Sequence, residues 1–272
     1  MSLHVMLRQG RTSSLEADVW YFPLGNSVDT KTLSLSGPFS KRGRTLPATF
    51  RFQRTELAGR EAWKTTIPEP SLWTPESPAY YQLSNSDELI GLRDLRIRGD
   101  SFYTADRRWL IRAAQLSTDS HSTSNLVRID SFLTKEAAIT ATQDGCPRII
   151  HSESPTPELI ATASESAAVL MLILPFDCRE DLGKLVHSHV LIGTHLEAGQ
   201  PIPAWAQFVS VSENLLNTAW KPERKIPVVA TRRGELENHT PDELRQMCDQ
   251  FQADLDHGAD YAGLWLLPKT SG

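Results

Sequence analysis

The pattern of apolar residues changes near Arg108, and this change constrains the fold more than any other feature of the chain. Before it, short segments alternate apolar and polar residues and are separated by Gly, Pro, Asn and Ser clusters, which is typical of a β-sandwich. After it, apolar runs of strand length alternate with helix-like segments, which favours parallel βα units. The sequence therefore predicts two units of different class.

The first unit contains four segments that are rich in β-branched and aromatic residues, as strands are. They are VWYFPL at 19–24, TLSLS at 32–36, ATFRFQRT at 48–55 and AWKTTI at 62–67. A further strand or hairpin, LRDLRIRG at 92–99, leads out of this unit.

The second unit contains six strand candidates. They are WLIRAAQL at 109–116, RIIHS at 148–152, AVLMLILP at 168–175, VLIGTHL at 190–196, IPVVAT at 226–231 and AGLWLLP at 262–268. A full eight-unit barrel usually takes about 250 residues. We therefore expect either an incomplete barrel or one in which some crossovers have shrunk to loops.

Helix-like segments lie between these strands and carry recognisable end signals. Thr156 and Thr240 stand where an N-cap would, each followed by Pro, and Gly145 and Gly258 stand where a C-cap would. The segments are 131–145, 156–167, 178–188, 204–220 and 240–258.

Composition narrows the classes of function. The chain has 272 residues and a net charge of -5, and its densest basic patch is the short KRGR at 41–44, so we expect no nucleic-acid partner. Three scattered cysteines, Cys146, Cys178 and Cys248, indicate free thiols rather than a disulfide framework. No signal peptide or membrane-spanning run is evident, so we expect no membrane association and a cytoplasmic location.

Motifs for common cofactors and nucleophiles are missing from the sequence. It contains no GxGxxG, GxxxxGK[ST] or GxSxG, so we expect no cofactor. His187, His189 and His195 stand close together, but without a carboxylate or cysteine at a ligand spacing. Packing or capping is therefore favoured over a metal site for these histidines.

The passage from Ser71 to Ala114 resembles one enzyme family. Its "LW-P-x-x-P-x-x-Y-x-L" and "GxR" patterns, here at 72–83 and 91–93, are similar to the junction in glycoside hydrolase family 2, which includes β-galactosidases, β-glucuronidases and β-mannosidases. The resemblance implies an immunoglobulin-like β-sandwich at residues 10–100, followed by a reduced TIM-type (β/α) barrel at residues 101–272.

The same resemblance extends to residues of the barrel. VHSHVLIGTHLEAGQ at 186–200 resembles the family's fourth strand, which makes Glu197 the acid/base candidate. The passage at 145–177 resembles the family's second and third strands, and His151 falls where the family has a substrate-side histidine. Leu196 replaces the family's asparagine before the acid/base glutamate.

The second catalytic carboxylate has a weaker counterpart. IPVVATRRGELENH at 226–239 resembles the family's seventh strand, yet Arg232 or Arg233 stands at the position of the nucleophilic glutamate. Glu235 is the candidate nucleophile from the adjoining loop, with Glu237 as an alternative. The substrate-binding candidates are His151, His195, Arg232, Trp205 and Trp265, although core packing is also open for the tryptophans.

Three hypotheses of function follow. The first is a glycosidase-like protein that has lost most or all catalysis and binds a carbohydrate or a protein partner at the barrel mouth. The second is an active retaining β-glycosidase with Glu197 as acid/base. The third is a structural or assembly protein with a closed barrel.

Overall fold

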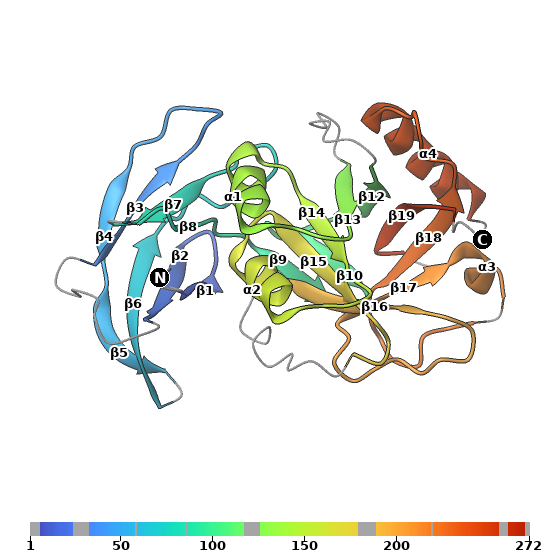
Figure 1. Cartoon of the computed structure of the whole chain (residues 1–272), viewed down its shortest axis with the longest axis horizontal. Helices are drawn as coiled ribbons and strands as arrows, with labels where there is room; N and C mark the ends of the chain where they lie inside the picture. Colours follow the sequence, from blue (N-terminus) through green and yellow to red (C-terminus); the bar gives the residue numbers. More distant parts are fainter. Residues whose placement is uncertain are drawn as a thin grey trace.

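The computed structural model describes residues 6–23, 33–57, 59–84, 86–116, 126–178, 189–218, 220–255 and 261–269. Figure 1 shows two units side by side. Antiparallel strands form the first, in blue and teal, and a closed barrel forms the second, in green to red.

Two four-stranded antiparallel sheets make up the first unit, which is a β-sandwich. Both sheets contribute side chains to one buried cluster, with Val19, Tyr21 and Trp63 from one sheet and Leu35 and Tyr81 from the other. The first sheet has the order β1 (Met6–Thr12), β2 (Glu16–Phe22), β6 (Arg60–Pro68), β5 (Gln53–Leu57), and the second β4 (Ala48–Arg51), β3 (Ser34–Phe39), β7 (Tyr80–Leu83), β8 (Leu89–Ile90).

The segment ATFRFQRT, expected as one strand, forms two. β4 and β5 belong to different sheets, and the chain changes sheet at Phe52. The side chain of Phe52 is buried in the sandwich core, and its backbone N–H donates to the Leu33 carbonyl at 3.2 Å. Alternating polarity predicts extended backbone, but not the point at which a chain crosses from one sheet to the other.

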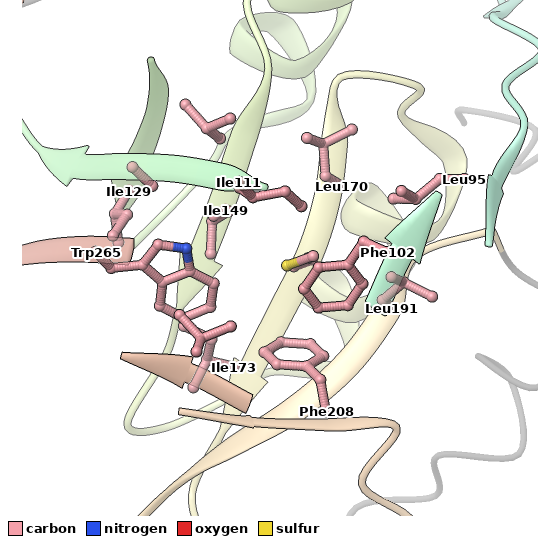
Figure 2. Close-up of a cluster of buried hydrophobic side chains, with 14 of the residues drawn as sticks. Leu95, Phe102, Ile111, Ile129, Ile149, Leu170, Ile173, Leu191, Phe208 and Trp265 are labelled. Atoms are coloured by element: carbon pink, nitrogen blue, oxygen red, sulfur yellow. The ribbon is translucent and has the colours of Figure 1, made fainter. Parts of the chain in front are cut away.

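A small three-stranded sheet connects the sandwich to the barrel. It consists of β9 (Leu95–Arg98), β10 (Ser101–Thr104) and β11 (Arg107–Arg108). Leu95 and Phe102 belong to the cluster inside the barrel, and the Phe102 ring meets Phe208 edge-on at 5.8 Å (Figure 2). Leu191 and Phe208 belong to the same cluster, and each is the first residue of a barrel strand. The small sheet therefore closes the N-terminal end of the barrel.

Eight parallel strands form the barrel, so the expected count of six was too low. Two strands were missed: β13 consists of four residues with Arg128 and Asp130 at alternate positions, and β17 lies inside the segment 204–220 that was expected as a helix. In order the strands are β12 (Ile111–Gln115), β13 (Val127–Asp130), β14 (Arg148–His151), β15 (Val169–Leu174), β16 (Leu191–Leu196), β17 (Phe208–Ser212), β18 (Val228–Gly234) and β19 (Gly263–Pro268).

The described helices are fewer than the strands. They are α1 (Lys135–Asp144), α2 (Pro157–Glu165), the four-residue α3 (Glu213–Leu216) and α4 (Pro241–Asp254). The Thr156 and Thr240 N-caps are confirmed, as is the left-handed Gly145 C-cap. Gly258 and most of the helix-like segment 178–188 lie outside the described residues. The barrel is thus complete in its strands and reduced in its crossovers.

The junction of the two units explains the GxR passage at 91–93. A Cβ on Gly91 would lie 2.5 Å from the Cβ of Ala167, so only glycine allows this approach. The buried Arg93 guanidinium donates to the carbonyls of Ala167 and Val169. Gln9 in turn holds the Arg93 backbone, accepting from its N–H at 3.1 Å and donating to its carbonyl at 2.5 Å.

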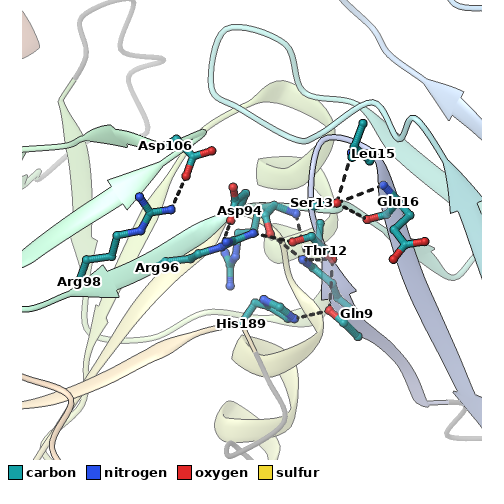
Figure 3. A network of polar contacts seen from close by, with 12 residues as sticks. Gln9, Thr12, Ser13, Leu15, Glu16, Asp94, Arg96, Arg98, Asp106 and His189 are labelled. Carbon is teal, nitrogen blue, oxygen red and sulfur yellow. Dashed lines mark hydrogen bonds and ion pairs between the residues drawn. The ribbon is translucent and has the colours of Figure 1, made fainter.

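Two further contacts fix the sandwich to the barrel. His189 lies beside Gln9 in Figure 3, and its Nε2 is 2.9 Å from the Gly10 carbonyl. Burial, together with the nearby Arg93 charge, lowers the pKa of His189 to about 4, so the imidazole is neutral. Trp73 donates from Nε1 to the Thr142 carbonyl of α1 at 2.7 Å. Among the described residues, no helix has the length and apolar character needed to span a bilayer.

Candidate ligand site at the barrel mouth

The complete strand count changes the position of Glu197 in the barrel. Glu197 follows β16, which is the fifth strand, not the fourth as the resemblance implied. The shift by one arises from the unrecognised β13. The fourth strand is β15, which ends at Leu174 and is followed by Pro175 and Phe176. No carboxylate stands at these three positions.

Two of the predicted residues, His151 and His195, come together at the C-terminal ends of β14 and β16. Residues inside the barrel alternate along each strand, with Ile149 preceding His151 and Leu191 preceding His195 on the inner face. The charge of His151 acts on His195, and the Nδ1 of His195 lies 3.2 Å from the hydroxyl oxygen of Ser210 on β17. Three strands therefore supply one polar cluster.

The surroundings of both imidazoles favour their neutral form. Burial is the main cause that lowers the pKa of His151 and of His195, and the positive charge of Arg233 lowers both further. Glu153 and Glu197 oppose this, each raising the pKa of the histidine two residues before it. A neutral imidazole donates from one nitrogen and accepts at the other, which suits a ligand that carries hydroxyl groups.

Arg233 supplies the positive charge of the cluster. It lies near the end of β18, opposite Leu267 of β19, and is exposed. Its Nη1 donates to the Pro268 carbonyl at 3.1 Å. The sequence analysis selected Arg232 of the Arg232–Arg233 pair as the substrate-binding residue. Which of the two arginines faces the cluster depends on the orientation of β18, and it is Arg233 that does.

Arg232 is the arginine that faces outward, away from the cluster. Its guanidinium lies 2.7 Å from a carboxylate oxygen of Glu213 and 2.7 Å from one of Asp254, and it covers the ring of Phe251 at 4.3 Å. These contacts fasten α3 and α4 to β18. The structure thus does not bring this predicted substrate-binding residue to the mouth.

The two predicted catalytic glutamates differ in their surroundings. Glu197 is exposed, and its backbone N–H donates to the Gln200 side chain at 2.9 Å. The carboxylate of Glu235 is 81% exposed and lies 2.8 Å from the Lys269 ammonium, which lowers its pKa. Glu235 therefore stands in a solvated ion pair after β18.

The tryptophans pack rather than present a free ring face. Trp265 is 1% exposed inside the barrel and meets Phe208 edge-on at 5.9 Å (Figure 2). Trp205 is half-buried against a cluster on the outside of the barrel that includes Leu174 and Ile192. An aromatic residue that sequence reasoning did not select, Phe132, follows β13 and is 67% exposed. No signal in the sequence separates Phe132 from a core residue.

His189 and His195, which stand close together in the sequence, contact different parts of the structure. His189 is bound to the sandwich and His195 to the mouth, while His187 lies outside the described residues. The part of the chain that the structure describes contains no group of three His, Cys, Asp or Glu residues arranged to hold a metal ion.

Comparison with solved structures supports the fold. The FMN-binding β-glucuronidase from Facaelibacterium prausnitzii L2-6 matches with a TM-score of 0.60 and 12% identity over 96% of this chain. A β-glycosidase from Bacteroides vulgatus matches at 0.49 with 12% identity over 84% of this chain, too low to add to the argument. No family model and no curated protein sequence matches.

The shared fold is a β-sandwich followed by an eight-stranded parallel barrel. The chain covers 54% of the length of the β-glucuronidase and 37% of the β-glycosidase. At 12% identity this likeness concerns the fold alone, and chemistry must be argued from the side chains.

Proposed function

We propose that this chain is a saccharide-binding relative of glycosidases that does not hydrolyse its ligand. The ligand site is the barrel mouth around His151, His195, Ser210 and Arg233. Parallel barrels place their sites at the C-terminal ends of their strands, where this cluster lies. The neutral imidazoles and the serine hydroxyl suit sugar hydroxyls, and the exposed Phe132 ring, which follows β13, offers an apolar face.

The observation that carries the proposal is the pair of arginines on the seventh strand. A retaining glycosidase needs two carboxyl groups about 5 to 5.5 Å apart on separate strand ends. Here β18 supplies Arg232 and Arg233, and β15 ends in Leu174 followed by Pro175. An arginine cannot attack an anomeric carbon. Glu235, which follows it in the chain, forms an ion pair with Lys269.

Hydrolysis and binding are tested on the same protein. We expect no release of nitrophenol from the 4-nitrophenyl β-galactoside, β-glucuronide or β-mannoside above a protein-free blank. Binding of the methyl β-glycosides is measured by saturation-transfer NMR and calorimetry. His195→Ala should weaken binding about tenfold through the loss of a hydrogen bond, whereas the exposed His239→Ala is a matched control that should bind as the wild type does.

An active β-glycosidase is the second candidate. Glu197 favours it, because its charge acts on His195 within the mouth cluster. Nitrophenol release that disappears in Glu197→Gln would establish this activity and refute the proposal. If the protein neither releases nitrophenol nor binds any methyl glycoside, the structural or assembly role with a protein partner is favoured instead.

A further inference from the structure

A large cavity lies outside the barrel mouth, on the flank of the barrel between α1 and α4. Its volume is ≈ 1240 Å³. In Figure 1, β12 and β13 lie between these two helices. Eight arginines and two acidic residues are among the described residues that line it, although the whole chain has a net charge of -5. Basic residues therefore outnumber acidic ones along this cavity, whereas acidic residues outnumber basic ones in the chain as a whole.

The outward-facing residues of the strands show that this flank differs from the rest of the barrel. Under α2 and α4 the outer positions are apolar and buried, as at Leu172 and Leu264. Along β12, β13 and β14 they include Arg112, Arg128 and Arg148. The outer face of these strands thus carries three guanidinium groups beside buried apolar residues such as Ala114 and Ile150.

The arginines form two triads, each with one aspartate between two guanidinium groups. Asp130 pairs with Arg128 at 2.5 Å and with Arg148 at 2.8 Å. Asp249 pairs with Arg112 at 2.9 Å and with Arg245 at 2.5 Å. In each triad two guanidinium groups face one carboxylate, and Arg107 and Arg108 of β11 also line the cavity.

Like charges stand close together in this groove. Arg128 and Arg148 are register partners on adjacent parallel strands, which places their Cα atoms about 5 Å apart. Arg148 is 16% exposed, and its buried Nε has no hydrogen-bond partner among the described residues. Opposed like charges and an unpartnered buried donor both cost stability, and both costs fall when an anion binds.

We propose that this groove binds a small organic anion that carries at least two carboxylate or phosphate groups. The forked guanidinium groups of Arg128, Arg148 and Arg112 match the oxygens of either acid group. Their spacing along three adjacent strands requires acid groups several ångströms apart, so monovalent anions fit poorly. Trp109 lines the same groove and can pack against the carbon skeleton.

Calorimetry at low ionic strength tests the proposal with citrate and with pyrophosphate, and with acetate and glycerol as weak and neutral comparisons. The proposal is supported if citrate or pyrophosphate binds with much higher affinity than acetate. Tighter binding of citrate would identify carboxylate as the preferred acid group, and tighter binding of pyrophosphate would identify phosphate. Arg148→Met and Arg112→Gln should each weaken the binding about tenfold or more. Should the Arg148 variant fail to fold, Arg112→Gln carries the test.

Matched controls separate this site from non-specific attraction and from the barrel mouth. Arg54→Gln removes one arginine that is 75% exposed on the sandwich, and it should leave the affinity for citrate unchanged. His195→Ala should also leave it unchanged. If neither multivalent anion binds, or if Arg54→Gln weakens binding as much as Arg112→Gln does, the groove is not a specific site.

Discussion

A buried acid shows how single residues set the response of this protein to pH. Glu165, at the end of α2, faces Arg8 and Glu88 of the sandwich as well as Lys135 of α1. Burial is the main cause that raises its pKa to about 7, and Glu88 adds to the effect. Its counterparts lie on β1, on α1 and just before β8, so no local pattern in the sequence identifies it.

Glu165→Gln should stabilise the protein above neutral pH. Because the folded-state pKa lies above the unfolded value near 4.5, folding takes up a proton, and stability is lost as the pH rises through about 7. We expect the variant to gain on the order of 1–3 kcal/mol at pH 8.5 and little at pH 4. Urea unfolding at both pH values measures this, and an equal effect at both would contradict it.

Elements of secondary structure were predicted best where their signals are local. Proline after a capping threonine identified α2 and α4, and apolar runs identified six barrel strands. The failures have a common physical cause, since β13 (VRID) and β17 (FVSVS) alternate apolar and polar residues and lack a long apolar run. The position of Glu197 in the barrel was wrong for that reason, whereas His151 and His195 met as strand-end residues on the inner face.

The capping box of α4 offers a test at this scale. Thr240 accepts from the Glu243 N–H at 3.3 Å, while the Glu243 carboxylate accepts from the Thr240 N–H at 2.7 Å. Thr240→Ala should lower the free energy of unfolding by about 1 kcal/mol, and Thr240→Ser should retain most of it. Equal unfolding midpoints for the three proteins would show that the cap contributes nothing.

The whole molecule is held together by a buried junction between the sandwich and the barrel. Arg93 is fully enclosed, and burial lowers its pKa to about 9. It joins Gln9 of the sandwich to two carbonyls at the start of the barrel's fourth strand. The GxR passage was recognised from the sequence as a junction, but its partner Gln9 was invisible there because 84 residues separate the two.

Loss of this junction should uncouple the two units. In Arg93→Met, two carbonyls lose a charged donor, and we expect a loss of about 3–5 kcal/mol. Differential scanning calorimetry should give one transition for the wild type and two for the variant. A single transition at an unchanged temperature in Arg93→Met would refute a coupling role for Arg93. Arg54→Gln, on the sandwich surface, is the control and should keep the wild-type profile.

The closed barrel also imposes an order on biosynthesis. β12 pairs with β19, so the first and last strands of the barrel are neighbours. Until the ribosome has released Gly263–Pro268, the edges of β12 and β18 stay unpaired, whereas the sandwich and the β9–β11 sheet have already emerged. During translation the unpaired edges of β12 and β18 can form hydrogen bonds with other chains. We expect chaperones that recognise extended apolar segments to bind these two strands.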